Sequence, residues 1–237
     1  MSLVVDDAVR ARLPGMLLVV AAAGGIDNRA ARPAIAEGLA AVAAALPAGW
    51  RWGSAQAHPH VAAWREALGR LGIPARKFPS AVESLTRRAL AGKGAPRINP
   101  LVDLYNFVSL AHVVPVGGWD VDELAGGDIL LRFTGGGERF RELGSEQTEL
   151  AGPGELGYAD REELITRHFV WRQSEKAKVT PSTRRVFMVS EILAAVGPAV
   201  AERVRESLAS GLEEHFGVRP LTAVLGPERN RWDWQGV

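Results

Sequence analysis

The 237-residue sequence contains no cysteine. A disulfide framework, a thiolate nucleophile and a cysteine-based metal site are therefore excluded. The glycine pair Gly24-Gly25 follows an apolar run, yet neither GxGxxG nor GxxxxGK[ST] is present, so we expect a plain strand-to-helix turn there. A G-x-S-x-G nucleophile motif is also missing. The five histidines lack a ligand-like spacing, so the sequence predicts no metal site, and it implies no cofactor.

Long hydrophobic runs are missing as well. The longest early run, Met16 to Ala23, is too short to cross a bilayer. It follows the acidic residues Asp6 and Asp7, whereas a signal peptide begins with a basic segment. We therefore expect a cytoplasmic protein with no membrane partner.

The composition is that of an ordinary globular protein, with 47% hydrophobic and 23% charged residues. No linker rich in Pro, Ser and Gly separates two cores, so we expect one domain over residues 1–237. Short apolar runs predict strands, and residues repeating every three or four positions predict helices. The strands are expected at Met16 to Ala23, Ile129 to Phe133, Ile165 to Arg172 and Val186 to Ile192, and the helices at Pro33 to Leu46, Pro59 to Leu71 and Pro198 to Phe216. Because strands and helices are mixed without strict alternation, the predicted fold class is α/β (α+β), a mixed sheet with helices packed around it.

The segment from Arg97 to Asp120 is the centre of the functional prediction. Its apolar residues from Leu101 to Leu110 recur at helical spacing. Asn99 is a credible helix cap, and Pro100 suits the first helical position because its missing N–H is not needed there. Asp103 and Asn106 share one helix face. We expect them to hydrogen-bond the loop that follows and to hold the wall of a pocket.

Two further helix starts are predicted from capping residues. Ser80 with Glu83 three positions later has the form of a capping box. Asp27 or Asn28 is expected to cap the helix that begins near Pro33.

The net charge of +1 conceals a strong polarity along the chain. The segment from Arg65 to Arg97 carries eight basic and two acidic residues, and the segment from Arg167 to Arg185 carries six basic residues and one acidic residue. The intervening segment from Asp120 to Glu163 is acidic. If the two basic segments meet in the fold, they form a positive surface suited to a phosphate backbone. Solvated helix faces and ordinary ion pairs are the alternative.

Several motifs occur together in one order: N-P-L-V-D-L-Y-N-F-V from Asn99, P-V-G-G-W-D from Pro115, G-D-I-x-L-R from Gly127, and T-x-x-T-x-x-V-x-x-x-x-E from Thr180 to Glu191. This set resembles the B3/B4 domain, the editing domain of the bacterial phenylalanyl-tRNA synthetase β subunit. The resemblance is good over about residues 80–195, which would be the core of the domain, with strand-helix elements before it and a closing helix at 198–216. At 237 residues the chain resembles the free-standing members of that family.

The resemblance implies a free-standing aminoacyl-tRNA deacylase, which hydrolyses the ester that joins a wrong amino acid to tRNA. Such an ester is already activated, so a positioned water, oxyanion donors and a selective pocket suffice. Glu191 matches the glutamate that recognises the polar end of the amino acid. The family motif P-L-H-A-F-D places its editing histidine at Gly117, so either other groups support the chemistry or tyrosine editing is absent. The alternative is a non-catalytic module that binds tRNA, other RNA or an amino acid.

The candidate site residues follow from these patterns, although no catalytic residue is predicted. The expected substrate-binding residues are Glu191, Thr180, Thr183, Gly117 and Asn106, and the expected RNA-binding residues are Arg87, Arg88, Arg172, Lys176 and Lys178. Three of these have structural alternatives: Glu191 could form a salt bridge to an arginine, Arg172 could anchor an internal acid, and a turn from Thr180 would explain both threonines. Trp171 either stacks on a base or amino acid or belongs to the core.

Overall fold

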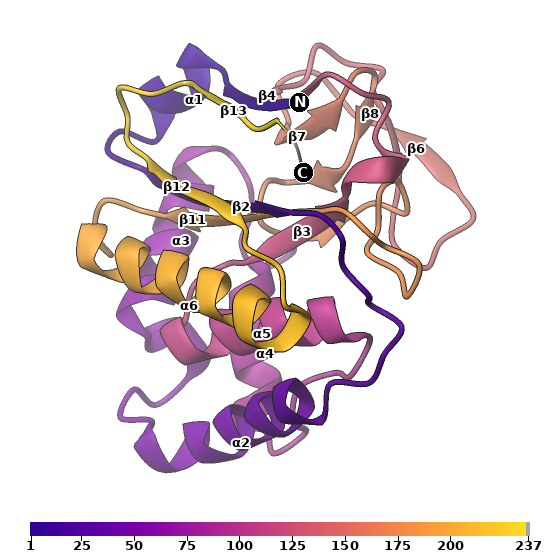
Figure 1. Ribbon diagram of the computed structural model, residues 1–237. Coiled ribbons are helices and arrows are strands. Elements are labelled where there is room, and N and C mark those ends of the chain that lie inside the picture. Colours follow the sequence, from indigo (N-terminus) through magenta and orange to yellow (C-terminus); the bar gives the residue numbers. More distant parts are fainter. Residues whose placement is uncertain (236–237) are drawn as a thin grey trace.

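A computed structural model describes residues 1–235 as two β-sheets stacked on a group of helices. Figure 1 shows the layers from top to bottom: the larger sheet, the smaller sheet, helices α5 and α6, and helix α2. The fold class is the predicted mixed α/β class. The N-terminal strand and the C-terminal strand are neighbours in the larger sheet, which brings both ends of the chain together.

The larger sheet has seven strands in the order β13-β1-β4-β7-β8-β5-β6. Strand β1 pairs in parallel with β4, and β5 with β8, while the other neighbours are antiparallel. Its strands are β1 (Ser2–Val5), β4 (Asp128–Phe133), β5 (Arg139–Arg141), β6 (Thr148–Leu150), β7 (Leu156–Asp160), β8 (Glu163–Leu164) and β13 (Arg231–Asp233).

The smaller sheet has four antiparallel strands in the order β12-β2-β11-β3. They are β2 (Leu17–Ala23), β3 (Gly117–Asp120), β11 (Val186–Ile192) and β12 (Leu221–Leu225). Strands β2 and β11 pair along their whole length, from Leu17 opposite Ile192 to Ala23 opposite Val186. Strand β2 is a continuous apolar run because both of its faces are covered, whereas β11 is apolar only up to Val189 and then carries the buried residues Ser190 and Glu191.

Six α-helices cover the sheets in the described part of the chain. They are α1 (Asp7–Arg12), α2 (Pro33–Gly49), α3 (Pro59–Arg70), α4 (Ala81–Leu90), α5 (Pro100–His112) and α6 (Pro198–Phe216). Helices α5 and α6 bury one face of the smaller sheet: Leu101, Leu104 and Val108 join Val204 and Leu208 in one apolar cluster with Val186 and Met188. Among residues 1–235 no helix is long and apolar enough to cross a membrane.

A second apolar cluster fills the space between the two sheets. Leu131 and Tyr158 of the larger sheet meet Val20, Phe187 and Val189 of the smaller one there. Side chains alternate along a strand, so Phe187, Val189 and Glu191 all point from β11 into this intersheet layer. A carboxylate therefore follows two apolar residues into the core of the protein.

Of the three capping predictions, the structure confirms one, contradicts one and confirms part of the third. Asn99 caps α5 as expected and accepts from Val102 N at 3.1 Å. The helix α2 has no side-chain cap, and Asn28 instead stabilises the start of α5 by accepting from Leu101 N at 2.9 Å and donating to Asn99 at 3.0 Å. Ser80 does accept from Glu83 N. The Glu83 side chain, however, is buried against Arg65 rather than turned back to close a capping box.

The segment Ile165 to Arg172 is not one strand, contrary to the prediction. It is a hairpin of two short strands, β9 (Thr166–Arg167) and β10 (Arg172–Gln173). The chain reverses at His168 and Phe169, which both have positive φ angles, of 50° and 63°. This turn buries Phe169 in the intersheet layer and leaves Trp171 half-buried at the surface.

Candidate functional site: an acidic pocket beside a basic groove

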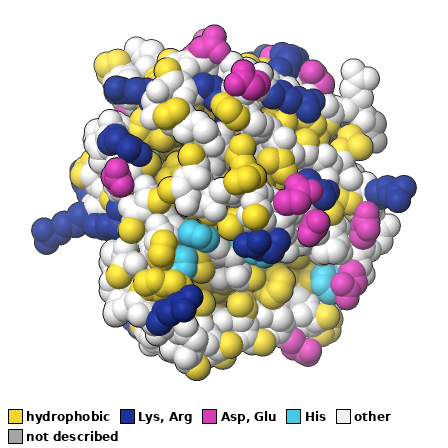
Figure 2. Space-filling model, turned by 90° about the vertical axis from the view of Figure 1, so that its left-hand side faces the viewer, with side chains coloured by type: hydrophobic (Ala, Val, Ile, Leu, Met, Phe, Trp, Pro, Cys, Tyr) yellow, Lys and Arg dark blue, Asp and Glu magenta, His cyan; other side chains and the backbone are white. Residues whose placement is uncertain are grey.

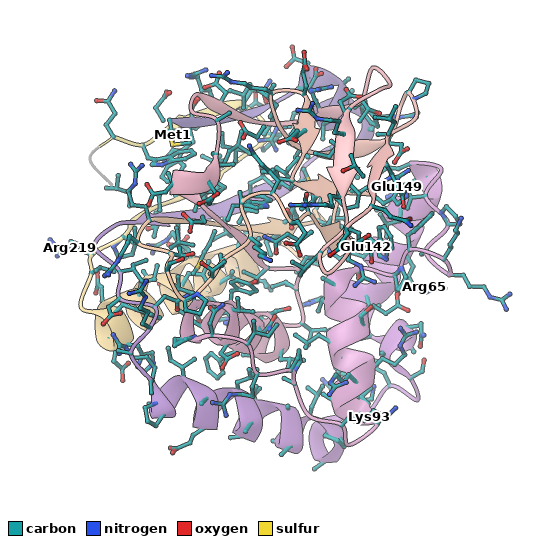
Figure 3. All side chains as sticks on the ribbon, turned by 90° about the vertical axis from the view of Figure 1, so that its right-hand side faces the viewer. Met1, Arg65, Lys93, Glu142, Glu149 and Arg219 are labelled. Carbon is teal, nitrogen blue, oxygen red and sulfur yellow. The ribbon has the colours of Figure 1, made fainter. Side chains whose placement is uncertain are left out.

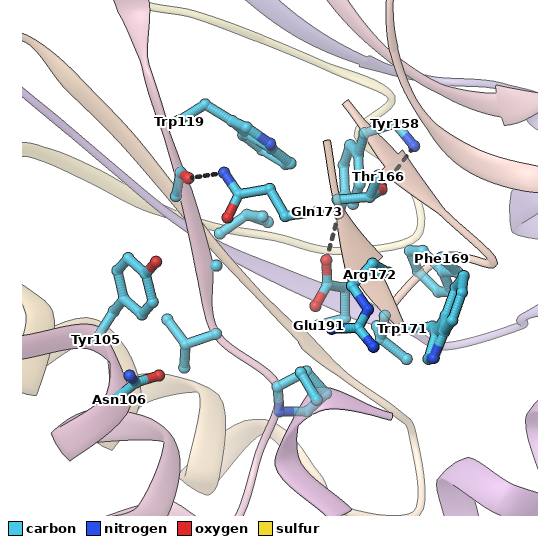
Figure 4. Close-up of a pocket in the computed structure, with 17 residues that line it drawn as sticks. Tyr105, Asn106, Trp119, Tyr158, Thr166, Phe169, Trp171, Arg172, Gln173 and Glu191 are labelled. Carbon is cyan, nitrogen blue, oxygen red and sulfur yellow. Dashed lines mark hydrogen bonds between the residues drawn. The ribbon is translucent and has the colours of Figure 1, made fainter. Parts of the chain in front are cut away.

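A cavity of about 160 Å³ lies between the sheets, α5 and the β9–β10 hairpin. Figure 4 shows its walls: Tyr105 and Asn106 on one side, Trp119 and Tyr158 at the top, and Trp171 and Arg172 on the other side. Five aromatic residues line it: Tyr105, Trp119, Tyr158, Phe169 and Trp171. A mostly apolar cavity that includes aromatic side chains and few polar groups is the usual form of a small-ligand site.

Glu191 is the charged group at the inner end of this pocket. Its side chain is only 4% exposed, and Oε1 accepts a hydrogen bond from Tyr158 Oη at 2.6 Å. Among the described residues, no arginine or lysine forms a salt bridge with Glu191, and Tyr158 is the only side chain that hydrogen-bonds it. Burial raises the pKa of Glu191 to about 7, and the hydrogen bond from Tyr158 partly opposes that rise. The carboxylate can therefore accept a hydrogen bond from a ligand in the pocket.

The opposite wall carries polar groups from α5. The pKa of the Tyr105 hydroxyl is raised, first by burial and then by the nearby charge of Asp103. Within residues 1–235, neither Tyr105 nor the Asn106 amide forms a side-chain hydrogen bond, and both line the pocket. Between these walls, Gln173 donates to Gly118 O at 2.9 Å and thereby ties the hairpin to β3. The pocket thus has a buried acceptor at one end and unpaired polar groups at the other.

The two glycines of the Pro115 to Asp120 segment have different structural roles. A Cβ at Gly118 would lie 3.2 Å from both the Met188 side chain and the backbone of Phe187, so close packing on β11 favours glycine there. A Cβ at Gly117 would meet nothing within 4 Å. Gly117 therefore leaves open space at the lining of the pocket.

A groove of about 580 Å³ adjoins the pocket. Pocket and groove share the lining residues Ala81, Asn106, Val116, Trp171 and Arg172. Its other walls carry Arg76, Lys77, Arg87 and Arg88 from the loop before α4 and from α4 itself. By contrast, acidic and basic side chains are mixed over the face shown in Figure 2. The groove therefore concentrates positive charge next to the opening of the pocket.

The structure brings together six of the ten predicted site residues. Glu191, Gly117 and Asn106 line the pocket, and Arg87, Arg88 and Arg172 line the groove, with Asn106 and Arg172 in both linings. Arg172 also forms a half-exposed ion pair with Glu142 at 3.1 Å, at the boundary between the sheets and the helices in Figure 3. An exposed ion pair of this kind contributes little to stability, so Arg172 remains able to bind a ligand.

The other four predicted residues lie outside both linings. Thr183 Oγ1 donates to Asp120 at 2.6 Å and accepts from Thr180 N at 2.9 Å, so the two threonines form a turn against β3. Lys178 pairs with Glu175, and Lys176 with Asp160 and Glu163.

Asp103 is also engaged elsewhere, contrary to the expectation that it holds the following loop. Its carboxylate binds Arg97 Nε at 3.0 Å and Ile98 N at 2.9 Å, both in the segment before α5. Asp103 therefore fixes the entry to α5 rather than the wall of the pocket.

Three residues of the site were not identified from the sequence. Tyr158, the partner of Glu191, lies in the fragment P-G-E-L-G-Y-A-D, where nothing local marks it as facing a strand of the other sheet. Arg76 and Lys77 belong to the first basic segment, but only the fold separates them from its ion-paired members. Within residues 1–235 no group of three His, Cys, Asp or Glu side chains could hold a metal ion.

The fold and site define a mixed α/β domain with an acidic small-ligand pocket beside a basic groove. The family model of the B3/4 domain matches residues 63–209, more than half of the chain, and the protein belongs to that family. This range extends on both sides of residues 80–195, where the sequence motifs are concentrated.

One curated protein and one solved structure are similar to parts of this chain. The phenylalanine-tRNA ligase beta subunit of Geobacter metallireducens is 38% identical over 63 residues, which cover 27% of this chain and 8% of that protein. A solved N-terminal fragment of the phenylalanyl-tRNA synthetase beta subunit from Pyrococcus horikoshii aligns with a TM-score of 0.45 and 12% identity. That alignment covers 93% of this chain and 52% of the solved chain. The chain thus spans only a small part of the curated relative and about half of the solved fragment.

Proposed function

We propose that this protein is a free-standing aminoacyl-tRNA deacylase that hydrolyses the ester of mischarged tRNA. One observation carries the proposal: a pocket with a buried carboxylate at its inner end adjoins a basic groove at the surface. An aminoacyl-tRNA has the complementary form, a small amino acid joined to a polyanionic strand. The match to the B3/4 family and to the named synthetase subunits supports the same substrate class.

In this proposal the pocket selects the amino acid. A side chain that ends in a hydrogen-bond donor satisfies the free lone pairs of Glu191, which Tyr158 holds in place. A side chain that lacks the donor leaves the lone pairs that Tyr158 does not occupy desolvated and without a hydrogen bond, which costs about 1–3 kcal/mol. Glu191 therefore discriminates between side chains of similar size.

The ester lies at the boundary of pocket and groove in this arrangement. The Asn106 amide and Arg172 are in both linings, and in this proposal they donate to the oxyanion as water attacks. The open space at Gly117 provides room for that water in the same part of the lining. No covalent intermediate is needed, since the ester is already activated.

A deacylation screen tests the proposal. The purified protein is incubated with a panel of correctly charged and mischarged tRNAs, and the released amino acid is measured over time. Rapid release from one mischarged species is expected. Glu191→Gln should slow it because the amide presents a donor where the substrate needs an acceptor. Glu206→Gln, which removes an exposed carboxylate on α6, is the matched control and should retain the wild-type rate.

The screen also separates catalysis from binding. Background release from the whole panel, together with measurable tRNA affinity, would contradict the deacylase and leave a non-catalytic binding module. Selective release that Glu191→Gln leaves unchanged would retain the deacylase but contradict the assigned role of the carboxylate.

A further inference from the structure

Four cations of the groove have no carboxylate partner. Among the described residues, no ion pair or side-chain hydrogen bond involves Arg76, Lys77, Arg87 or Arg88. All four are exposed, and the single aromatic contact of the set is Lys77 Nζ over the Phe78 ring at 5.0 Å. Unneutralised cations that gather in one groove are suited to an external polyanion.

Other basic residues of the same chain segment are neutralised. Arg65 pairs with Glu83 at 2.9 Å, Arg70 with Glu66 at 3.3 Å, and Arg97 with Asp103 at 3.0 Å. None of these three lines the groove. Apart from Lys93, which forms no ion pair among the described residues and does not line the groove, the basic residues of the segment are either paired elsewhere or unpaired at the groove.

Trp171 lies where the groove meets the pocket. It lines both, and it is half-buried although the adjacent Phe169 is fully buried. Its ring contacts Phe78 edge-on at 4.8 Å, and the Arg172 guanidinium lies 5.3 Å from its centroid. The β9–β10 turn fixes this position through two consecutive residues with positive φ, a conformation that costs free energy unless the surroundings support it.

We propose that Trp171 and Arg172 form a stacking site for the nucleobase of the nucleotide that carries the ester, and that the unpaired cations bind the phosphates of the nucleotides before it. The occupant of the groove is then the single-stranded 3′ end of an RNA. Proteins that bind single strands combine these two features, an aromatic ring for each bound base and a cationic track for the backbone. The inference rests on the proposed function for the direction of the strand, with its 3′ terminus at the pocket.

This arrangement gives the two halves of the site separate tasks. Stacking on Trp171 fixes the terminal nucleoside at the mouth of the pocket, and the aminoacyl group extends inward to Glu191. The phosphates leave along Arg87 and Arg88, away from the buried carboxylate. An acidic peptide would satisfy the cations but would leave the Trp171 ring without a stacked partner.

Binding of uncharged oligonucleotides tests the stacking site without any ester. One labelled single strand ends in a normal 3′-terminal nucleotide, and a second has an abasic sugar at that position. Trp171→Leu should weaken binding of the normal strand by about 5- to 150-fold, the range expected for one lost base stack. The same substitution should leave binding of the abasic strand unchanged. Trp171→Phe, which keeps an aromatic face, should restore most of the affinity.

Trp52 provides a matched control for this substitution. It is also half-buried and also has a neighbouring guanidinium near its ring, that of Arg51 at 5.2 Å, but it lines neither pocket nor groove. Trp52→Leu should therefore leave the affinity for both strands unchanged. Equal weakening of the normal and abasic strands by Trp171→Leu would overturn the stacking site, as would no weakening of either.

The salt dependence of binding tests the phosphate track. The double variant Arg87→Gln, Arg88→Gln should reduce the slope of log affinity against log salt concentration by about 1.4, since each lost phosphate contact on a single strand contributes about 0.7. Arg70→Gln removes a paired cation and should not change the slope. An unchanged slope in the double variant would overturn the track. Because these assays need no charged tRNA, a failure here is distinguishable from a failure of the deacylase proposal.

Discussion

The buried carboxylate at the end of the pocket should make the stability of this protein depend on pH in an unusual direction. Most carboxylates are stabilised as anions in a folded protein. Glu191 is desolvated instead, and its pKa rises from an ordinary 4.5 to about 7. The Tyr158 hydrogen bond favours the anion, and no salt bridge in the described chain supports it. The charge of Arg10 acts on the hydroxyl of Tyr158, whose pKa it lowers.

The magnitude follows from the two pKa values. Between pH 4.5 and 7 the folded state holds a proton on Glu191 that the unfolded state has lost, so the free energy of unfolding falls as pH rises. Below pH 4.5 Glu191 is protonated in both states, so its burial does not lower the free energy of unfolding through ionisation. Above pH 7 it is ionised in both states, and the full cost applies. A shift of about 2.5 units corresponds to about 3 kcal/mol.

Urea unfolding of the wild type and of Glu191→Gln measures the free-energy cost of ionising Glu191 in the folded protein. The glutamine cannot ionise, and its carbonyl oxygen can still accept from Tyr158. The variant should therefore gain stability relative to the wild type by about 3 kcal/mol between pH 5 and pH 8. Taking the difference between the two proteins removes the titration of every other group.

Glu138 provides a control because its pKa is shifted in the opposite direction from that of Glu191. Its pKa is lowered to about 2 despite its burial, because Arg132 and the backbone of Gly135 and Gly136 hydrogen-bond the anion. Glu138→Gln should destabilise the protein by the same amount at pH 5 and pH 8, since Glu138 is ionised throughout that range. A constant difference for Glu191→Gln as well would refute the reasoning about its burial.

Three further predictions concern packing around the site. Gly118→Ala should lower the free energy of unfolding by about 1–3 kcal/mol, because its Cβ would overpack β11 at 3.2 Å. Gly117→Ala should change the free energy of unfolding by less than about 0.5 kcal/mol. Equal effects of the two substitutions would contradict the open space at Gly117. Gly211→Ala should destabilise the protein by about 1–3 kcal/mol, because its Cβ would lie 2.5 Å from Leu104, and an unchanged thermal midpoint would contradict the close contact of α5 and α6. Asn28→Ala should cost about 2–4 kcal/mol in urea unfolding, because it leaves buried partners at the start of α5 unsatisfied; a loss below about 0.5 kcal/mol would show that water replaces the amide.

The local elements of this fold could be predicted because their signals are local. The helix after Asn99 and Pro100 begins at the expected residue, and the structure confirms the strand Val186–Ile192 and the helix Pro198–Phe216. Each is defined by a cap or by the spacing of its own apolar residues. The hairpin at Ile165 to Arg172 could not be predicted in this way. The chain reverses there because His168 and Phe169 have positive φ angles, and neither residue type is typical of a turn.

The site was predictable only in part, because its contacts join distant segments. Glu191 was identified through a motif, but its partner Tyr158 comes from the other sheet and is defined by how the two sheets stack. The RNA-binding prediction treated the basic residues as equivalent. Lys176 pairs with Asp160 and Glu163, and Lys178 pairs with Glu175, while Arg87 and Arg88 have no ion pair among the described residues. Only the three-dimensional arrangement of the acidic residues distinguishes the two lysines from the two arginines.

The central claim is that the acidic pocket and the basic groove act together on one mischarged tRNA. Its most direct test is the single-turnover rate of ester hydrolysis for the species found in the screen, measured with wild type, Glu191→Gln and Glu206→Gln. The account predicts rapid release by the wild type and the Glu206 variant, and release near the uncatalysed rate by the Glu191 variant. Release at the uncatalysed rate by the wild type from every mischarged tRNA would contradict it.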